Sequence, residues 1–256
     1  YWLADQTLTL GMEWNRDELN DPASMQATDV SGETIAGTSG NAADRSSKNS
    51  ATLTGIYLED NIETTPGTNI IPGLRFDYHN QFGSTWSPSL NLSQALGEWF
   101  KVKAGIARVF KAPNLYQSSE GYLLSTRGNG CPNAIATGSC YLLGNPDLDP
   151  EISINKELGL EFNAGGYNAG ITWFRNDYKN KIVSGTEVLG YTSSGNNILQ
   201  WQNGGKAVVE GLEGTVLIPL ITDTLNWRTN ATWMIKSESK DTGNPLSVIP
   251  KYTINT

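Results

Sequence analysis

The sequence lacks any long hydrophobic run. None of its 256 residues lies in a stretch that approaches about 18 consecutive apolar side chains, which excludes a transmembrane helix. A β-strand, by contrast, crosses a bilayer with only about 9 to 11 residues of alternating character. The absence therefore excludes a helical membrane protein and leaves a membrane-spanning sheet open.

Histidine is nearly absent, and nucleophile motifs are missing. His79 is the only histidine, whereas acyl transfer needs a base beside its nucleophile and a histidine-based metal site needs several rings. We therefore predict no enzymatic activity, no catalytic residue and no resident metal or cofactor. We expect Arg75 and Asp77, the polar neighbours of His79, to form solvated ion pairs, each of which contributes little to stability.

An excess of positive charge is also lacking. The chain has 18 lysine and arginine residues against 26 aspartate and glutamate residues, which gives a net charge of −8. Nucleic-acid-binding proteins normally carry a basic stripe. We therefore expect no nucleic-acid partner.

Only two cysteines are present, Cys131 and Cys140, in a segment rich in glycine, asparagine and threonine. Their proximity favours a local disulfide formed in an oxidising compartment, which would stabilise the loop by roughly 2 to 3 kcal/mol. Two free thiols are the alternative. A zinc site is the weakest interpretation, because the segment has neither a CxxC motif nor a nearby histidine.

Alternation of apolar and polar residues, by contrast, is abundant. Ile154, Lys156, Leu158, Leu160 and Phe162 fall on one face of a strand, and polar or small side chains fall on the other. This period of two predicts about ten strands, at residues 6–16, 51–64, 69–82, 86–97, 99–112, 153–164, 168–183, 206–220, 225–239 and from 251. The faces of 51–64, 99–112 and 168–183 are ambiguous in the sequence.

Short and long connections alternate between these segments. The turns at TTPGT, LGEW, NAGGY and ITDT are tight, and one shorter connection occurs at QFGST. The remaining connections are long, near 17–50, 113–152, 184–205 and 240–250. Hairpins at one rim and elaborated loops at the other are typical of outer-membrane barrels, and soluble β-sandwiches rarely have them.

Strand length agrees with a membrane barrel. A strand of about 12 residues, tilted by about 45°, covers roughly 28 Å, close to the apolar band of about 25 Å. Amphipathic tryptophans favour the interfacial depth, and the candidates for such girdles are Trp86, Trp99, Trp173, Trp201, Trp227 and Trp233. We predict an all-β fold, a transmembrane antiparallel up-and-down β-barrel, to which residues 1–256 contribute about ten strands. Because a sheet with free edges is not tolerated in lipid, we expect the whole barrel to be larger.

Two motifs resemble those of a known family. FKAPNLYQ at 110–117 and GNPDLDPE at 144–151 resemble the paired signature of TonB-dependent outer-membrane receptors. SPSLNLSQALG, INKELGLEF, ITWFRNDYKNKI and KAVVEGLEG are similar to segments of the ferric enterobactin receptors, the catecholate siderophore branch. We interpret the prolines and Asn145 of the two motifs as residues that shape the rim rather than contact a ligand.

The resemblance implies a fold and a function. It implies a barrel of about 22 strands in the bacterial outer membrane, with an N-terminal plug domain and C-terminal strands that lie outside this chain. Long loops would be extracellular, and short turns periplasmic. The protein would import a ferric catecholate siderophore with energy supplied by TonB through the plug, and iron would enter only as part of that ligand. Outer-membrane lipid and lipopolysaccharide would surround the barrel.

A ferric tris-catecholate is a bulky trianion with aromatic rings, so recognition requires cations and aromatic faces. Arg127 is the first candidate, because it is the only basic residue in the loop from 114 to 153 and the resembled receptors place a basic residue in the corresponding loop. A solvated arginine is the alternative. The further candidates are Tyr116, Gln117 and Tyr122 in the same loop and, more weakly, Trp201 and Tyr191 in the next.

Three other functions remain open at this point. A passive porin would share the strands but not the paired motifs. A TonB-dependent receptor for haem would typically carry N-P-N-L after F-R-A-P and ligating histidines on its loops, and this sequence has neither. A soluble β binding module would dissolve without detergent.

Overall fold

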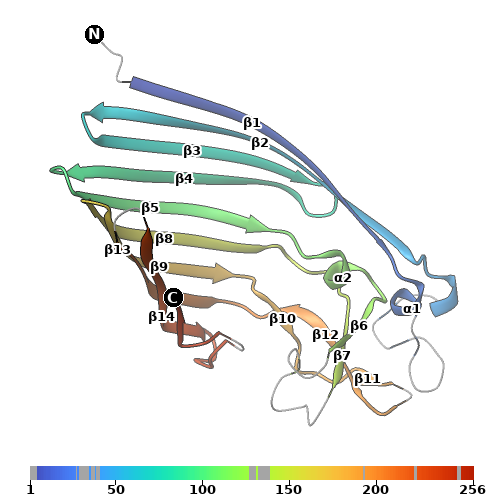
Figure 1. Cartoon of the computed structure of the whole chain (residues 1–256). Coiled ribbons are helices and arrows are strands. Elements are labelled where there is room, and N and C mark those ends of the chain that lie inside the picture. The colour runs from blue at the N-terminus through green and yellow to red at the C-terminus, as the bar shows by residue number, and fades with distance from the viewer. Residues whose placement is uncertain are drawn as a thin grey trace.

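In the computed structural model, one long curved sheet carries a cluster of loops at one of its ends (Figure 1). The structure describes residues 5–26, 28, 35, 38, 41–126, 131, 139–192, 194–221, 224–246 and 249–256. No helix within these ranges is long and apolar enough to cross a membrane.

Ten antiparallel strands form the large sheet, each bonded to its neighbour in the order β1-β2-β3-β4-β5-β8-β9-β13-β14-β15. Their bounds are β1 (Asp5–Asn20), β2 (Lys48–Thr65), β3 (Thr68–His79), β4 (Gly83–Leu96), β5 (Phe100–Lys111), β8 (Glu151–Ala164), β9 (Tyr167–Lys179), β13 (Ala207–Ile221), β14 (Leu225–Ser239) and β15 (Tyr252–Asn255). The predicted number of strands and the up-and-down order are confirmed.

The two rims of the sheet differ as the sequence predicts. One rim carries only short connections, at 66–67, 97–99, 165–166 and 222–224. Gly67, Gly97 and Gly165 have positive φ angles in these turns, a conformation that glycine adopts without steric cost. The other rim carries the long connections at 21–47, 112–150, 180–206 and 240–251.

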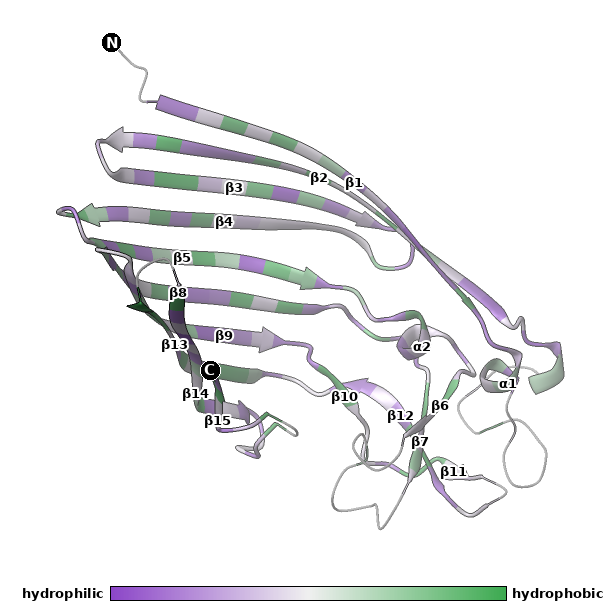
Figure 2. Ribbon diagram, in the orientation of Figure 1, coloured by the Kyte–Doolittle hydropathy of each residue, from purple (hydrophilic) through white to green (hydrophobic). Residues whose placement is uncertain are grey.

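One face of the sheet is an apolar band. Hydrophobic and hydrophilic residues alternate along the strands (Figure 2). The register places Val102, Leu160 and Ile171 side by side on neighbouring strands, and Leu160 and Ile171 are 41% and 52% exposed. Such a row of exposed aliphatic side chains across a sheet fits contact with hydrocarbon.

The register also assigns the faces that were ambiguous in the sequence. In β2, Ile56 and Leu58 share the apolar face with Asp60, which interrupts the hydrophobic pattern. In β9, Trp173 lies opposite Leu158, so Arg175 and Asp177 continue the same face toward the long-loop rim. The strands extend beyond the apolar band, and their outer face becomes charged there.

Two local expectations were wrong. Arg75 does pair with Asp77 at 2.7 Å, and with Glu13 at 2.8 Å, but the Asp77 side chain is only 6% exposed, because it lies under the guanidinium. The pair is therefore not a solvated one. Trp201 is not a girdle residue, because it belongs to a loop rather than to a barrel strand.

The long loops form a second, smaller sheet that the sequence did not predict. Its strands pair in the order β10-β12-β7-β6, with β11 also paired to β12, and β12 runs parallel to β7. The bounds are β6 (Leu123–Thr126), β7 (Cys140–Leu143), β10 (Ile182–Ser184), β11 (Gly190–Tyr191) and β12 (Asn197–Asn203). We call this element the rim sheet.

The most deeply buried apolar residues belong to the rim sheet. Leu142, Leu143, Ile198 and Leu199, on the parallel strands β7 and β12, are completely buried. Ile35, from the first long loop, packs against Leu143 and Ile198. Three loops that are distant in sequence thus share one hydrophobic core at the rim.

Candidate functional site

The site lies at the long-loop rim, where polar contacts supplement the shared core. The described part of these loops contains three short helical segments, α1 (Pro22–Met25), η1 (Ala42–Asp44) and α2 (Leu115–Ser118). Asn49, at the start of β2, donates a hydrogen bond of 2.6 Å to Ser119, which follows α2. The second loop is therefore attached to the start of β2, close to the end of the first loop.

Helix α2 begins within the first motif. Pro113 precedes its N-cap, Asn114, and the backbone N–H of Asn114 donates to the side-chain oxygen of Gln117 at 2.9 Å. The side chain of Asn114 in turn accepts a hydrogen bond from the backbone N–H of Gln117, which completes a capping box. Gln117 is 6% exposed. Its side-chain oxygen stabilises the start of α2, a role that the sequence analysis did not anticipate.

Three aromatic candidates lie together in the structure. The ring of Tyr116 lies 6.4 Å from that of Tyr122 and 6.2 Å from that of Trp201, both tilted. These separations suit tilted aromatic contacts. Tyr116 and Trp201 are partly exposed, whereas Tyr122 is buried. We call these three residues the aromatic cluster; Tyr122 supports it from below.

The hydroxyl of Tyr122 attaches the cluster to the first loop. It donates to a carboxylate oxygen of Asp21 at 3.3 Å. Hydrogen bonds from Ser24 hold the pKa of Asp21 below its ordinary value, and burial raises the pKa of Tyr122 above its own. At neutral pH the carboxylate is therefore charged and the phenol keeps its proton, as this hydrogen bond requires.

Trp201 is held by its backbone rather than by its indole nitrogen. Its carbonyl oxygen accepts a hydrogen bond of 2.9 Å from the side chain of Asn145. Its indole N–H is buried and has no hydrogen-bond partner among the residues that the structure describes. An unpaired buried donor is costly, so this nitrogen contributes nothing to holding the ring in place.

Arg127, the first candidate cation, lies outside the described residues. The same loop contains the predicted disulfide, and the bond between Cys131 and Cys140 is confirmed. Tyr191, the weakest candidate, is 53% exposed on β11 and is not part of the aromatic cluster.

Arg45 is a cation that the sequence analysis did not select. A side chain added at Gly121 would meet its guanidinium, so Arg45 lies against the residue before Tyr122. It also donates to Thr38 at 2.7 Å. Nothing local in the sequence links residue 45 to residue 121, because the contact depends on how the two loops fold together.

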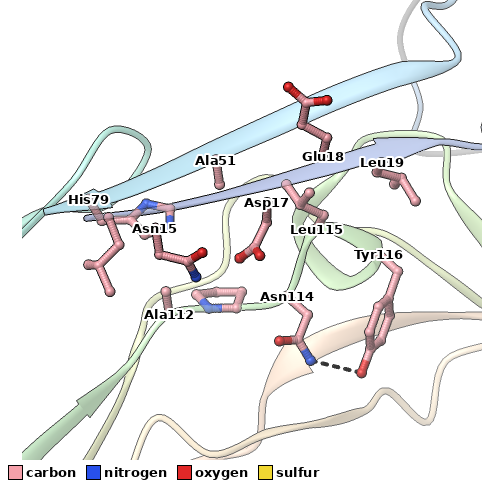
Figure 3. A pocket seen from close by; sticks show the side chains of 12 residues that line it. Asn15, Asp17, Glu18, Leu19, Ala51, His79, Ala112, Asn114, Leu115 and Tyr116 are labelled. Carbon is pink, nitrogen blue, oxygen red and sulfur yellow. Dashed lines mark hydrogen bonds between the residues drawn. The ribbon is translucent and has the colours of Figure 1, made fainter. Parts of the chain in front are cut away.

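A cavity of about 470 Å³ lies between β1 and α2, and Tyr116 of the aromatic cluster forms part of its wall (Figure 3). Its wall includes Asp17, Glu18 and His79, with Asn114 and Tyr116 on the α2 side. The lining contains two carboxylates and no lysine or arginine. The interior of this cavity is therefore poorly suited to a trianion.

Comparison with known proteins identifies the family. The family model described as TonB dependent receptor-like, beta-barrel, matches residues 1–256. The chain belongs to this TonB-dependent receptor family. Its strands are accordingly those of an outer-membrane barrel, with the long loops at the extracellular rim and the short turns at the periplasmic rim.

The most similar relatives include siderophore receptors. The chain is 60% identical over 253 residues to the ferric enterobactin receptor PirA of Pseudomonas aeruginosa, an alignment that covers 99% of this chain and 34% of that protein. It is 48% identical over 258 residues to the ferrienterobactin receptor of Escherichia coli, again covering 99% of this chain and 34% of the relative. The chain thus spans about a third of the length of these receptors.

A solved structure of a TonB-dependent receptor has the same architecture. A variant of the ferric enterobactin receptor PfeA from Pseudomonas aeruginosa, in complex with enterobactin, aligns with a TM-score of 0.80 at 50% identity. The alignment covers 99% of this chain and 36% of that one. The predicted fold class, an all-β transmembrane barrel of which this chain is a part, is confirmed.

Proposed function

We propose that the whole protein is an outer-membrane receptor that binds a ferric catecholate siderophore and imports it with energy from TonB. The relatives named above are ferric enterobactin receptors. The observation on this chain that carries the proposal is the aromatic cluster at the extracellular rim, where three rings from two loops meet. Iron arrives within the ligand, so the barrel needs no resident metal.

The chemistry of the rim suits such a ligand. Catecholate rings are flat and electron-rich, and they can stack on the exposed parts of Tyr116 and Trp201. The negative charge of the ferric complex requires cations, which Arg45 and Arg127 can supply. The acidic cavity between β1 and α2 would not retain the trianion. In this proposal, recognition occurs at the rim and precedes passage into the barrel.

TonB would act through the plug domain, outside this chain. A barrel of about 22 strands needs such a plug, because its lumen is otherwise wide enough for solutes to pass. A passive porin is the competing function. Planar-bilayer conductance separates the two functions, since the intact receptor should be closed and a porin should conduct continuously.

Replacing Tyr116 by alanine tests the proposed binding surface. We expect the whole receptor to bind ferric enterobactin about tenfold more weakly, which corresponds to a loss of about 1.4 kcal/mol from one aromatic contact. Quenching of intrinsic fluorescence by the ligand measures the affinity. Trp99→Ala, at a periplasmic turn, is the control and should leave the affinity unchanged. Equal affinities in the Tyr116→Ala variant and the unaltered receptor would contradict this assignment.

We propose that phosphorylated headgroups of the outer leaflet, such as those of lipopolysaccharide, contact the charged end of the outer face. Asp177 lies there with three cations, Lys156 at 2.8 Å, Arg175 at 3.2 Å and Lys240 at 2.5 Å. Glu210 pairs with Arg175 at 3.2 Å, which leaves a local excess of one positive charge. Anionic headgroups directly above the apolar band would neutralise this excess positive charge.

Lys240→Gln tests this lipid contact. The purified receptor should retain less lipopolysaccharide, about half the phosphate per protein, because one of the three cations is gone. Lys103→Gln is a matched control, because Lys103 also pairs with a carboxylate, that of Glu161 at 2.6 Å, but on the luminal face. Equal lipid phosphate in both variants would exclude the headgroup site.

A further inference from the structure

Residues 144–151, the GNPDLDPE motif, contact the third long loop at four places. The side chain of Gln200 donates to the carbonyl of Gly144 at 3.3 Å, and that of Asn145 donates to the carbonyl of Trp201 at 2.9 Å. Asn203 accepts from the backbone N–H of Asp149 at 2.8 Å and donates to its carbonyl at 2.9 Å. The fourth contact is made by Glu151.

Glu151 is a buried carboxylate at the junction of barrel and rim sheet. Its side chain is 5% exposed, and one oxygen accepts the backbone N–H of Ile182 at 2.7 Å. The amino groups of Lys111 and Lys181 lie 3.3 Å and 3.7 Å from its oxygens. Lys111 belongs to the FKAP motif, so the two motifs of the sequence meet in space at this residue.

These contacts have a shared feature. The side chains of Glu151 and Asn145 bind backbone atoms of the third loop, the N–H of Ile182 and the carbonyl of Trp201. In the other direction, the side chains of Gln200 and Asn203 in the third loop bind backbone groups of the motif. Backbone contacts fix where the chain runs without requiring particular side chains at positions 182 and 201.

We infer that residues 144–151 form a clasp that fixes the third loop against the second, with Glu151 and Asn145 as positioning residues for Trp201. The clasp begins one residue after β7 and ends at the first residue of β8. It therefore sets the height of β12 above the barrel and places the Trp201 ring against Tyr116. Its role in ligand recognition rests on the proposed function, whereas the coupling of the two loops does not.

Amide hydrogen exchange on the whole receptor in detergent tests the coupling directly. Glu151→Ala removes the acceptor for Ile182 and leaves that buried backbone N–H without its partner, which is destabilising locally. We expect exchange in peptides that cover 182–203 to rise at least about tenfold, although the substitution lies on β8, outside that loop. Glu151→Gln keeps an acceptor oxygen for Ile182, and we expect it to restore part of the protection.

Two further variants separate the clasp from general damage. Glu161→Ala, on the same strand β8, removes a luminal ion pair with Lys103 and should leave exchange in 182–203 unchanged. Asn203→Ala acts from the other side of the clasp and should raise exchange in 144–150. If the Glu151→Ala receptor does not assemble in the membrane, Asn203→Ala still tests the clasp.

The affinity for ferric enterobactin is measured on the same samples. We expect Glu151→Ala and Asn203→Ala to bind about tenfold more weakly, and Glu161→Ala to bind like the unaltered receptor. Unchanged exchange in 182–203 overturns the clasp. Raised exchange with full affinity overturns the positioning role. If the unaltered receptor binds no catecholate, the proposed function fails, and the exchange data still decide the clasp.

Discussion

Replacing Leu160 by arginine is expected to destabilise the assembled barrel by about 2 to 4 kcal/mol or to prevent its assembly. Leu160 lies between Val102 and Ile171 on the apolar face of the sheet and is 41% exposed. A guanidinium at this depth loses its hydration without gaining a partner, and the penalty for arginine near the bilayer midplane is of this size. Urea titration of the whole receptor folded in liposomes measures the loss.

The control for Leu160→Arg uses the opposite face of the same strand. Glu157 is exposed and points to the luminal side, three residues away. Glu157→Arg should change the free energy of unfolding by less than about 1 kcal/mol, because the side chain remains in water. Equal losses for the two variants would mean that the two faces meet the same solvent, and the membrane assignment would be wrong.

The barrel strands could be predicted because lipid and lumen impose opposite requirements on alternate residues. The pattern in 154–162 placed Leu158 and Leu160 on the apolar face, where the register has them. Faces stayed ambiguous where strands carry charge on the outer side, as Asp177 does in β9. Apolar and polar residues alternate only where one face of the strand meets lipid and the other meets water. Where a strand extends past the hydrocarbon, both faces meet water and the alternation is lost.

The rim sheet could not be predicted because its pairing is set by tertiary contacts. Strands β7 and β12 are short, lie more than 50 residues apart and run parallel. Neither has the alternation that a half-buried strand requires, since Leu142 and Leu143 are both completely buried. Ile35, in the first loop, completes their core. Such a sheet has no local signal beyond a few consecutive apolar residues.

The candidate site was predicted in part. Tyr116, Tyr122 and Trp201 were selected as aromatic residues on long loops, and the structure brings them together. Their role in binding stays a prediction, as does that of Gln117, whose oxygen caps α2. Arg45 was missed because its proximity to the cluster depends on how the first loop folds back over the second.

The rim-shaping interpretation of the second motif receives a physical basis from two contacts. Asn145 accepts the N–H of Asp147 at 2.9 Å through its side chain, which forms the tight turn that Asn-Pro predicts. Glu151 pairs with Lys111 of the first motif. The two motifs thus stand at the two ends of the second loop, and the pair of Lys111 and Glu151 joins these ends at the barrel rim.

Replacing Gly144 by alanine is expected to have the largest effect on the extracellular loops. A Cβ at Gly144 would overlap the carbonyl oxygen of Ser119, a backbone atom of a residue that is only 2% exposed. Since Ser119 is held by α2 and by Asn49, it cannot move without disrupting both. Overpacking of this kind costs about 1 to 3 kcal/mol. The affinity for ferric enterobactin should fall at least about tenfold.

Limited proteolysis and ligand titration of the whole receptor check the Gly144→Ala prediction together. The second loop should be cleaved faster, because α2 and β7 no longer pack, while the barrel should stay intact since the substitution lies above it. Gly190→Ala is the matched control, because nothing lies within 4 Å of a Cβ added there. If Gly144→Ala resisted proteolysis as well as Gly190→Ala does, the close approach of Gly144 to Ser119 would not constrain the loop. The aromatic cluster would then owe its arrangement to the clasp alone.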